Sequence, residues 1–152
     1  MISTRLDTTA DRAWQAVKRT ETFVHITRGL LGFAGARELP EEWREGEAIR
    51  ARLRFFNFLP AWEHELRVVR VDDRRRVLHT NEGGGFISRW NHVIRIEAGG
   101  GTYCRYTDEI EIKAGVLTSV VWLYAHLFYR YRQMRWRRLA RRINESTGHT
   151  NN

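Results

Sequence analysis

Two histidines and one aspartate are the residues in this sequence best suited to chemistry. His64, His92 and Asp108 each lie in a separate segment where apolar and charged residues alternate. Alternate side chains of a strand point to the same face, so these patterns place all three on the apolar, inward face of a sheet. A histidine beside a buried carboxylate can accept and return a proton, as a cyclase or dehydratase requires. The alternative is a set of core groups that only hydrogen-bond to one another.

Metal and thiol chemistry receive less support from the sequence. His64, His92 and Asp108 are acceptable ligand types, but they lie on separate strands and match no metal motif, so we predict no metal and no cofactor. Cys104 is the single cysteine, which excludes an intrachain disulfide. A nucleophilic thiol needs an adjacent base, so we expect Cys104 to be a small buried hydrophobe. Residues 83–85 are three glycines that predict a hairpin turn, because no helix follows them as in a phosphate loop.

The elements that must position these side chains are strands joined by short turns. Alternation of period two predicts strands at about Glu47–Phe55, Trp62–Val68, Trp90–Glu97 and Arg105–Lys113. A shorter strand is expected at Val77–Glu82, although its pattern does not define which side chains face inward. Short connections between consecutive strands favour an antiparallel sheet.

Helical patterns flank this run of strands. After a first strand at Ile2–Leu6, Thr8 or Thr9 can cap a short helix, and a second short helix is expected at about Glu21–Arg28. Glycines then predict a loop over residues 29–35. A long helix is expected at about Leu117–Glu145, and its apolar face is assigned to Leu117, Val120, Val121, Tyr124, Phe128 and Tyr131.

An apolar cavity is expected between the inward sheet face and this helix. A lining that is mostly apolar with a few polar groups is typical of a small-molecule site. Large aromatic side chains can also fill such a space completely. The candidate ligand-binding residues are Leu53, Phe55, Trp62, His64, Leu66, Trp90, His92, Ile94, Tyr106, Asp108, Val121, Tyr124 and Phe128.

Positive charge is concentrated in the last quarter of the chain. The net charge is +8, yet residues 115–152 carry seven arginines and one acidic residue, Glu145. These arginines either form a solvated helix end or make a weak contact with an acidic surface, where Trp136 could insert into lipid. Specific nucleic-acid binding is not expected, because no aromatic platform is interleaved with them. The arginines of this surface prediction are Arg130, Arg135, Arg137, Arg138, Arg141 and Arg142, and the oligomeric state stays open.

Length and composition favour one globular domain. The chain has 152 residues, 42% of them hydrophobic, which suffices for a core without disulfides. We expect one domain over residues 1–146 and a flexible tail over 147–152. The N-terminus has no apolar run typical of a secretion signal, and the most apolar segment, Val116–Tyr129, is too short to cross a bilayer. A cytoplasmic location is therefore expected.

The order of elements, with three stretches of sequence, resembles the helix-grip fold of the START-related SRPBCC superfamily, and in particular its polyketide cyclase/dehydrase-like branch. These stretches are the early helix with Ala13-Trp14, the segment from Trp90 to Ile110, and the terminal helix around Phe128 to Leu139. The resemblance implies an α+β fold in which a curved antiparallel sheet wraps around a long C-terminal helix, with two short helices after the first strand. It also implies binding of a small hydrophobic or aromatic molecule, lipid or polyketide-like. An enzyme of cyclase or dehydratase type and an Arg-rich interaction module are the alternatives, since members of one fold differ in function.

Overall fold

The computed structural model describes residues 1–34, 39–55, 59–85 and 87–148, and it describes no side chain at positions 33, 34, 51, 53, 55, 59–62 and 146–148. The chain begins with β1 (Ile2–Leu6), α1 (Ala10–Lys18) and α2 (Thr20–Thr27). The strands β2 (Leu31–Ala34), β3 (Ala48–Phe55), β4 (Leu59–Asp72), β5 (Val77–Gly84), β6 (Ile87–Ala98) and β7 (Cys104–Lys113) follow. A short 3-10 turn, η2 (Gly115–Leu117), leads into the terminal helix α3 (Thr118–Gly148).

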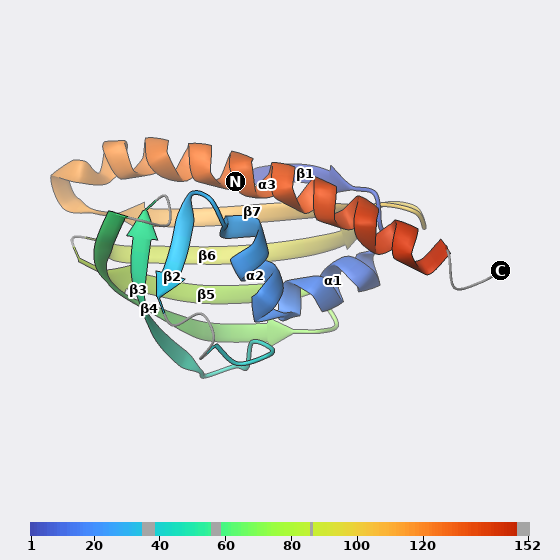
Figure 1. Cartoon of the computed structure of the whole chain (residues 1–152), viewed down its shortest axis with the longest axis horizontal. Coiled ribbons are helices and arrows are strands. Elements are labelled where there is room, and N and C mark those ends of the chain that lie inside the picture. Colours follow the sequence, from blue (N-terminus) through green and yellow to red (C-terminus); the bar gives the residue numbers. More distant parts are fainter. Residues whose placement is uncertain (35–38, 56–58, 86, 149–152) are drawn as a thin grey trace.

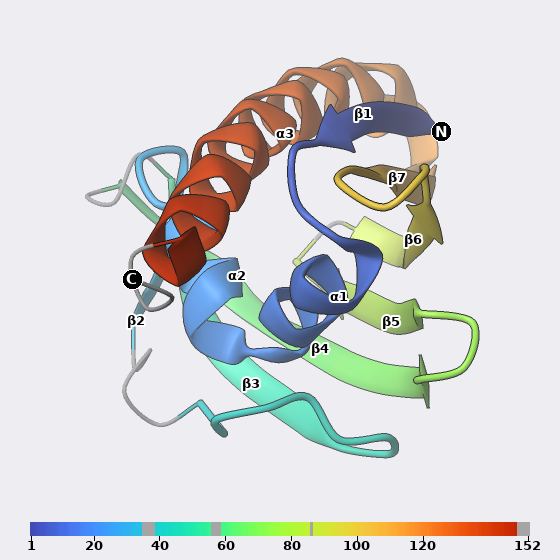
Figure 2. The ribbon, with the colours of Figure 1, turned by 90° about the vertical axis from the view of Figure 1, so that its right-hand side faces the viewer.

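The described strands form one antiparallel sheet in the order β1-β7-β6-β5-β4-β3-β2. β1 pairs with β7, so the first and last strands of the chain lie side by side, with Ile2 opposite Asp108. Viewed from its end, the sheet is an arc that holds α1 and α2, and α3 closes the open side (Figures 1 and 2). The predicted helix-grip architecture is confirmed, with two short helices between the first and second strands.

The short helices form where their capping signals predict them. Thr9 is the N-cap of α1, and its side chain accepts a hydrogen bond from the backbone N–H of Arg12 at 3.4 Å. Ala13, Trp14 and Val17 of α1 are buried against the sheet. The Trp14 indole N–H also donates to Asp73 at 2.7 Å, which ties α1 to the turn after β4.

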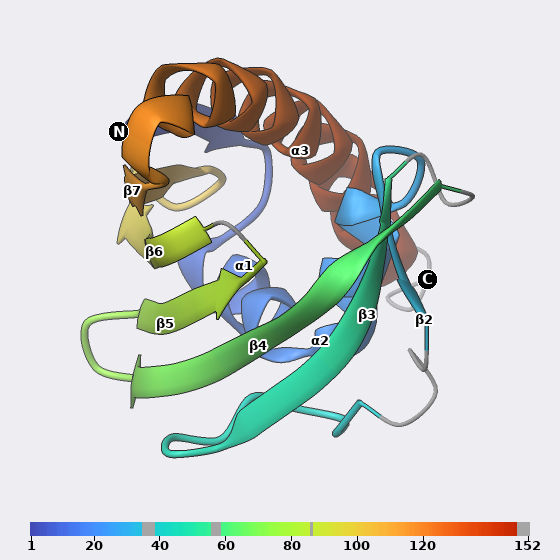
Figure 3. The ribbon, with the colours of Figure 1, turned by 90° about the vertical axis from the view of Figure 1, so that its left-hand side faces the viewer.

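The predicted loop over residues 29–35 is wrong for residues 31–34, and residue 35 lies outside the described residues. Residues 31–34 form β2, which pairs with β3 at the edge of the sheet (Figure 3). Gly29, with φ of 107°, makes the turn between α2 and β2, and a Cβ there would lie 2.8 Å from the Tyr131 hydroxyl. Glycine at this position therefore marks a close approach to α3 rather than a long loop.

The interior divides into two clusters along α3. One packs α1, α2 and the sheet around Trp136 and Ala140 in the second half of the helix. The other packs β6 and β7 against Val121, Ala125 and Phe128 in the first half. Leu117 and Val120, which the sequence assigned to the apolar face, are exposed. Among the described residues, no helix is both long and apolar enough to cross a membrane.

Candidate functional site

A chain of buried polar side chains crosses the concave face of the sheet. The antiparallel register places Thr80 of β5 opposite His92 of β6, and Ile94 of β6 opposite Asp108 of β7. Side chains of His92 and Asp108 therefore lie diagonally across adjacent strands on the same face, within reach of each other. Both are almost fully buried.

Asp108, on β7, accepts the largest number of hydrogen bonds in this series of buried polar side chains. It accepts hydrogen bonds from His92 Nε2 at 2.8 Å, from the Tyr106 hydroxyl at 2.8 Å and from Gln133 Nε2 at 3.2 Å. The Arg132 guanidinium donates to the Tyr106 hydroxyl at 3.0 Å, and its Nη2 lies 3.7 Å from Asp108 Oδ1. Arg132 and Gln133 both come from α3, so the network fixes the helix to the sheet.

Glu82 is a second carboxylate at the β5 end. Its Oε2 lies 3.1 Å from His64 Nε2, and its Oε1 accepts a hydrogen bond from the Thr80 hydroxyl at 3.0 Å. The same Oε1 is 3.9 Å from His92 Nδ1. His92 consequently lies between two carboxylates, with Asp108 on one ring nitrogen and Glu82 facing the other.

Both carboxyl groups remain ionised despite their burial. Burial alone would raise the pKa of Asp108, but the charge of Arg132 and the hydrogen bond from His92 outweigh it and hold the pKa below its usual value. Burial likewise acts to raise the pKa of Glu82, and the hydrogen bond and charge of His64 reverse the effect. Burial acts to lower the pKa of Arg132, but neighbouring Tyr106 and Asp108 act more strongly to raise it. The net pKa is above its usual value, so the guanidinium stays protonated.

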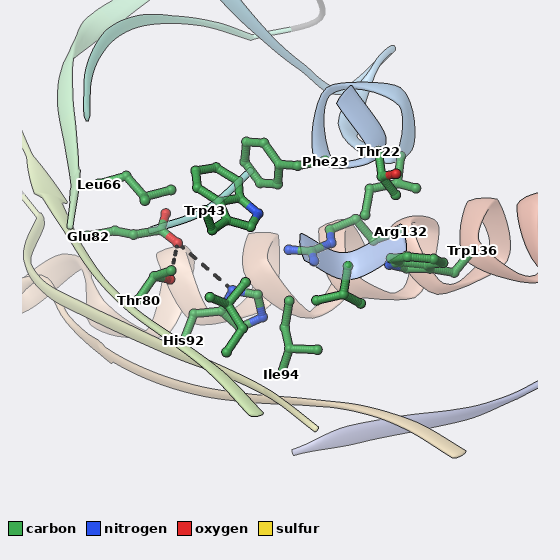
Figure 4. A pocket seen from close by; sticks show the side chains of 13 residues that line it. Thr22, Phe23, Trp43, Leu66, Thr80, Glu82, His92, Ile94, Arg132 and Trp136 are labelled. Atoms are coloured by element: carbon green, nitrogen blue, oxygen red, sulfur yellow. Dashed lines mark hydrogen bonds and ion pairs between the residues drawn. The ribbon is translucent and has the colours of Figure 1, made fainter. Parts of the chain in front are cut away.

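A small cavity opens beside this network (Figure 4). Its volume is about 20 Å³, room for about one water molecule. Glu82, Thr80 and His92 reach it from the sheet, and Arg132 points into it from α3 (Figure 4). The remaining walls are Val17, Thr22, Phe23, Ile26, Trp43, Leu66, Leu78, Ile94 and Trp136.

Only part of the predicted lining meets at this cavity. Leu66, His92 and Ile94 line it. His64, Tyr106 and Asp108 are buried one layer behind, where they bond to lining residues. Trp90, Val121, Tyr124 and Phe128 belong to the other cluster, around the first half of α3, where Trp90 Nε1 donates to Tyr129 at 3.1 Å. The side chains of Leu53, Phe55 and Trp62 lie outside the described residues.

Sequence reasoning missed Glu82, Thr80 and Arg132. Leu78 is buried, and counting by twos from it places Thr80 and Glu82 on the same inward face. Arg132 is one helical turn after Phe128, which puts it on the buried side of α3, with a 2% exposed side chain. Trp136 is likewise buried, packed 5.3 Å from the Tyr106 ring, so the predicted insertion of Trp136 into lipid is wrong.

Other predicted reactive groups have simpler surroundings. Cys104 is buried against the core, and burial raises the pKa of its thiol to about 11, so it is a poor nucleophile at neutral pH. Within the described part of the chain, no cluster of three or more His, Cys, Asp and Glu side chains is arranged to hold a metal ion. Of the surface arginines, Arg135 donates to the backbone carbonyl of His25 at 2.8 Å, while Arg130, Arg137, Arg138, Arg141 and Arg142 are exposed.

No protein-family model matches this sequence, and no curated protein matches it. Solved structures share its fold. The aromatase/cyclase Zhui from a Streptomyces species superimposes with a TM-score of 0.65 at 10% identity, covering 93% of this chain and 92% of that one. Truncated norcoclaurine synthase from Thalictrum flavum gives a TM-score of 0.62 at 14% identity, over 91% and 89% of the two chains. A protein from Chromobacterium violaceum gives 0.65 at 11% identity, over 91% and 95%. The chain thus has the fold of these helix-grip proteins.

Proposed function

We propose that this protein binds a small, oxygen-bearing hydrophobic or aromatic molecule, polyketide-like or lipid, between the sheet and α3, in the cytoplasm. The observation that carries the proposal is the convergence of Glu82, His92 and Arg132 on one cavity, whose other walls are apolar apart from Thr22 and Thr80. A guanidinium donates hydrogen bonds and a carboxylate accepts them, so the two can fix a carbonyl or phenolate oxygen and a hydroxyl of one ligand. The aromatic rings of Phe23 and Trp43 offer a stacking wall.

Ligand entry requires side chains to move, because the cavity holds about one water molecule as it stands. Phe23 and Trp43 pack edge to face with ring centroids 5.5 Å apart, and Phe23 is only half-buried. We infer that Phe23, on the short helix α2, gives way to the ligand. The buried Nε of Arg132, which lines the cavity, has no hydrogen-bond partner among the described residues and would gain one from a polar ligand atom or a water.

The test is a thermal-shift and native mass-spectrometry screen with matched pairs of compounds. We expect a hydroxylated bicyclic aromatic such as 2-naphthol to raise the melting temperature more than naphthalene does. Glu82→Gln should weaken its binding about tenfold, since a charged hydrogen bond becomes a neutral one, whereas the exposed Glu63→Gln should have no effect. Phe23→Ala enlarges the cavity and should strengthen binding. If neither hydroxylated aromatics nor fatty acids bind the wild type or Phe23→Ala, the proposal fails.

A second candidate function is proton-transfer catalysis of the cyclase or dehydratase type. It is favoured by the geometry of His92, whose Nε2 is held by Asp108 while its Nδ1 faces Glu82 at the cavity. In a dehydration, His92 would take the proton that a ligand carbon loses and return it to the departing hydroxyl, which leaves as water. Turnover by wild type but not by His92→Gln, with ligand affinity retained by both, would establish catalysis. Equal turnover by the two proteins would exclude this role.

A further inference from the structure

The outer face of α3 is apolar at its beginning and basic at its end. Val120, Leu123 and Leu127 are 67%, 57% and 61% exposed, and Val116 just before the helix is fully exposed. Their spacing of four, three and four residues places them on one side of the helix. This side faces away from the sheet, because Val121, Ala125 and Phe128 on the other side of the helix are the residues buried against β6 and β7. Figures 2 and 3 show α3 lying across the open side of the sheet. The surface of Val116, Val120, Leu123 and Leu127 is called the apolar end below. Trp122 is also exposed, on the flank of the helix about 100° around from Leu123.

The same stripe continues into arginines. Counting three or four residues onward from Leu127 leads to Arg130, Met134, then Arg137 with Arg138, and Arg141. Arg130, Arg137, Arg138 and Arg141 are exposed, and Glu145 is the single acidic residue in positions 115–152. The stripe from Val120 to Arg141 is about 30 Å long, because a helix rises about 1.5 Å per residue. These exposed arginines are called the basic end.

We propose that this stripe docks the protein on an anionic lipid surface. The apolar end inserts among the acyl chains and the basic end lies against the headgroup phosphates, so α3 meets the bilayer at a tilt. Trp122 is 60% exposed and stacks on His126 with ring centroids 5.5 Å apart, and an indole favours the boundary between headgroups and acyl chains. Arginine forks bind phosphate oxygens in pairs, which suits the other end.

A second copy of this chain fits the stripe less well. Parallel pairing would bring the arginines of two basic ends together, and antiparallel pairing would place each basic end on an apolar end. Both arrangements leave charges unpaired at an interface, which costs free energy. A bilayer supplies an apolar layer and an anionic layer at adjacent depths, so it matches both ends at once.

The experiment is co-sedimentation of the full chain with vesicles of phosphatidylcholine alone or mixed with phosphatidylglycerol. We expect binding to the anionic vesicles only, with weaker binding at high salt because ions screen the arginines. The triple variant Arg130→Gln, Arg137→Gln, Arg138→Gln should bind about 100-fold more weakly, since each basic residue near an anionic surface contributes about fivefold. Its matched control, Arg52→Gln, Arg54→Gln, Arg74→Gln, removes the same charge from other exposed positions and should bind like the wild type.

The apolar end is tested separately. The double variant Leu123→Ser, Leu127→Ser should weaken vesicle binding about tenfold, because two leucine side chains are no longer transferred from water into the bilayer. Val69→Ser, on the exposed face of the sheet, should not weaken it. Lipids brominated in their acyl chains should quench the wild-type fluorescence, and Trp122→Phe should lose that quenching.

Three outcomes would overturn the proposal. The first is absence of binding to anionic vesicles at low salt. The second is equal weakening by the charge variant and its control. The third is tight binding to polyglutamate that survives the leucine substitutions, or a dimer that those substitutions dissociate, because either result assigns the stripe to a protein partner.

Discussion

The two halves of α3 differ in what they bury, because only the second half adds charged and amide side chains to the apolar ones. In the first half, Thr118–Phe128, the sheet-facing residues are apolar, and Val121 is 8% exposed. In the second half, Arg132 and Gln133 face the sheet and bond to Tyr106 and Asp108. The outer faces differ too, since the first half exposes leucines and the second exposes arginines.

Residue type therefore does not mark the buried face of this helix. Valine occurs on both faces of the first half, and arginine occurs on both faces of the second. The two faces differ in their position relative to the sheet. A buried arginine is stable only where a carboxylate lies close enough to pair with it. Three pairs of substitutions and one change of pH test this difference, and the largest effect comes first.

Trp136 and Trp122 test burial at its extremes. Trp136 is 1% exposed and Trp122 is 60% exposed. We expect Trp136→Ala to lower the free energy of unfolding by about 4 kcal/mol, because it leaves a cavity in the core. Trp122→Ala should change it by less than about 0.5 kcal/mol. Urea titration followed by circular dichroism measures both, and similar losses would contradict the assigned faces.

Arg132 and Arg130 test the same contrast for charge. Arg132→Met should cost about 3 kcal/mol, because Asp108 is left charged and buried with only its hydrogen bonds from His92, Tyr106 and Gln133. Arg130→Met, on the exposed face, should cost less than about 0.5 kcal/mol. Should the two variants unfold at the same urea concentration, the role assigned to the buried guanidinium is wrong.

Acid should reduce the difference in stability between the wild type and Arg132→Met. The folded-state pKa of Asp108 is below its unfolded value, so the stability it contributes is present above about pH 4 and is lost as the pH falls further. Burial is the largest influence on the pKa of Asp108, and the charge of Arg132 is the largest one opposing it. We therefore expect this pKa to rise in Arg132→Met, so that acid relieves the cost of the buried carboxyl rather than adding to it. The gap in melting temperature between wild type and Arg132→Met should therefore narrow from pH 7 to pH 4, and a constant gap would count against this account.

The smallest effect concerns two adjacent valines. Val121 is buried and Val120 is 67% exposed. Val121→Ala should cost about 1 kcal/mol through lost packing, and Val120→Ala should be close to neutral. A reversed order in the urea midpoints would mean that α3 is rotated relative to the sheet.

The fold could be predicted further from the sequence than the site. Strands such as 90–97 alternate cleanly because one face is apolar and the other charged, and Thr9 marks the start of α1. In α3 that contrast is weak, so the sequence analysis placed Val120 inward and did not assign Arg132 to the inward face. Glu82 was missed because a carboxylate beside glycines suggests a turn, and only its partner His64, 18 residues away, explains its burial. Pairings between distant strands are tertiary facts that local patterns do not contain.

The pairing of β1 with β7 has a consequence for how the chain is made. Residues 2–6 leave the ribosome about 100 residues before their partners, residues 104–108. At roughly 5–20 residues per second of synthesis, β1 waits at least several seconds without a strand to join. Its edge and the apolar side chains of Ile2 and Leu6 are open to chaperones and to neighbouring chains during that interval. Closure of the sheet is therefore a late, long-range event, and a slow folding phase is expected for so small a protein.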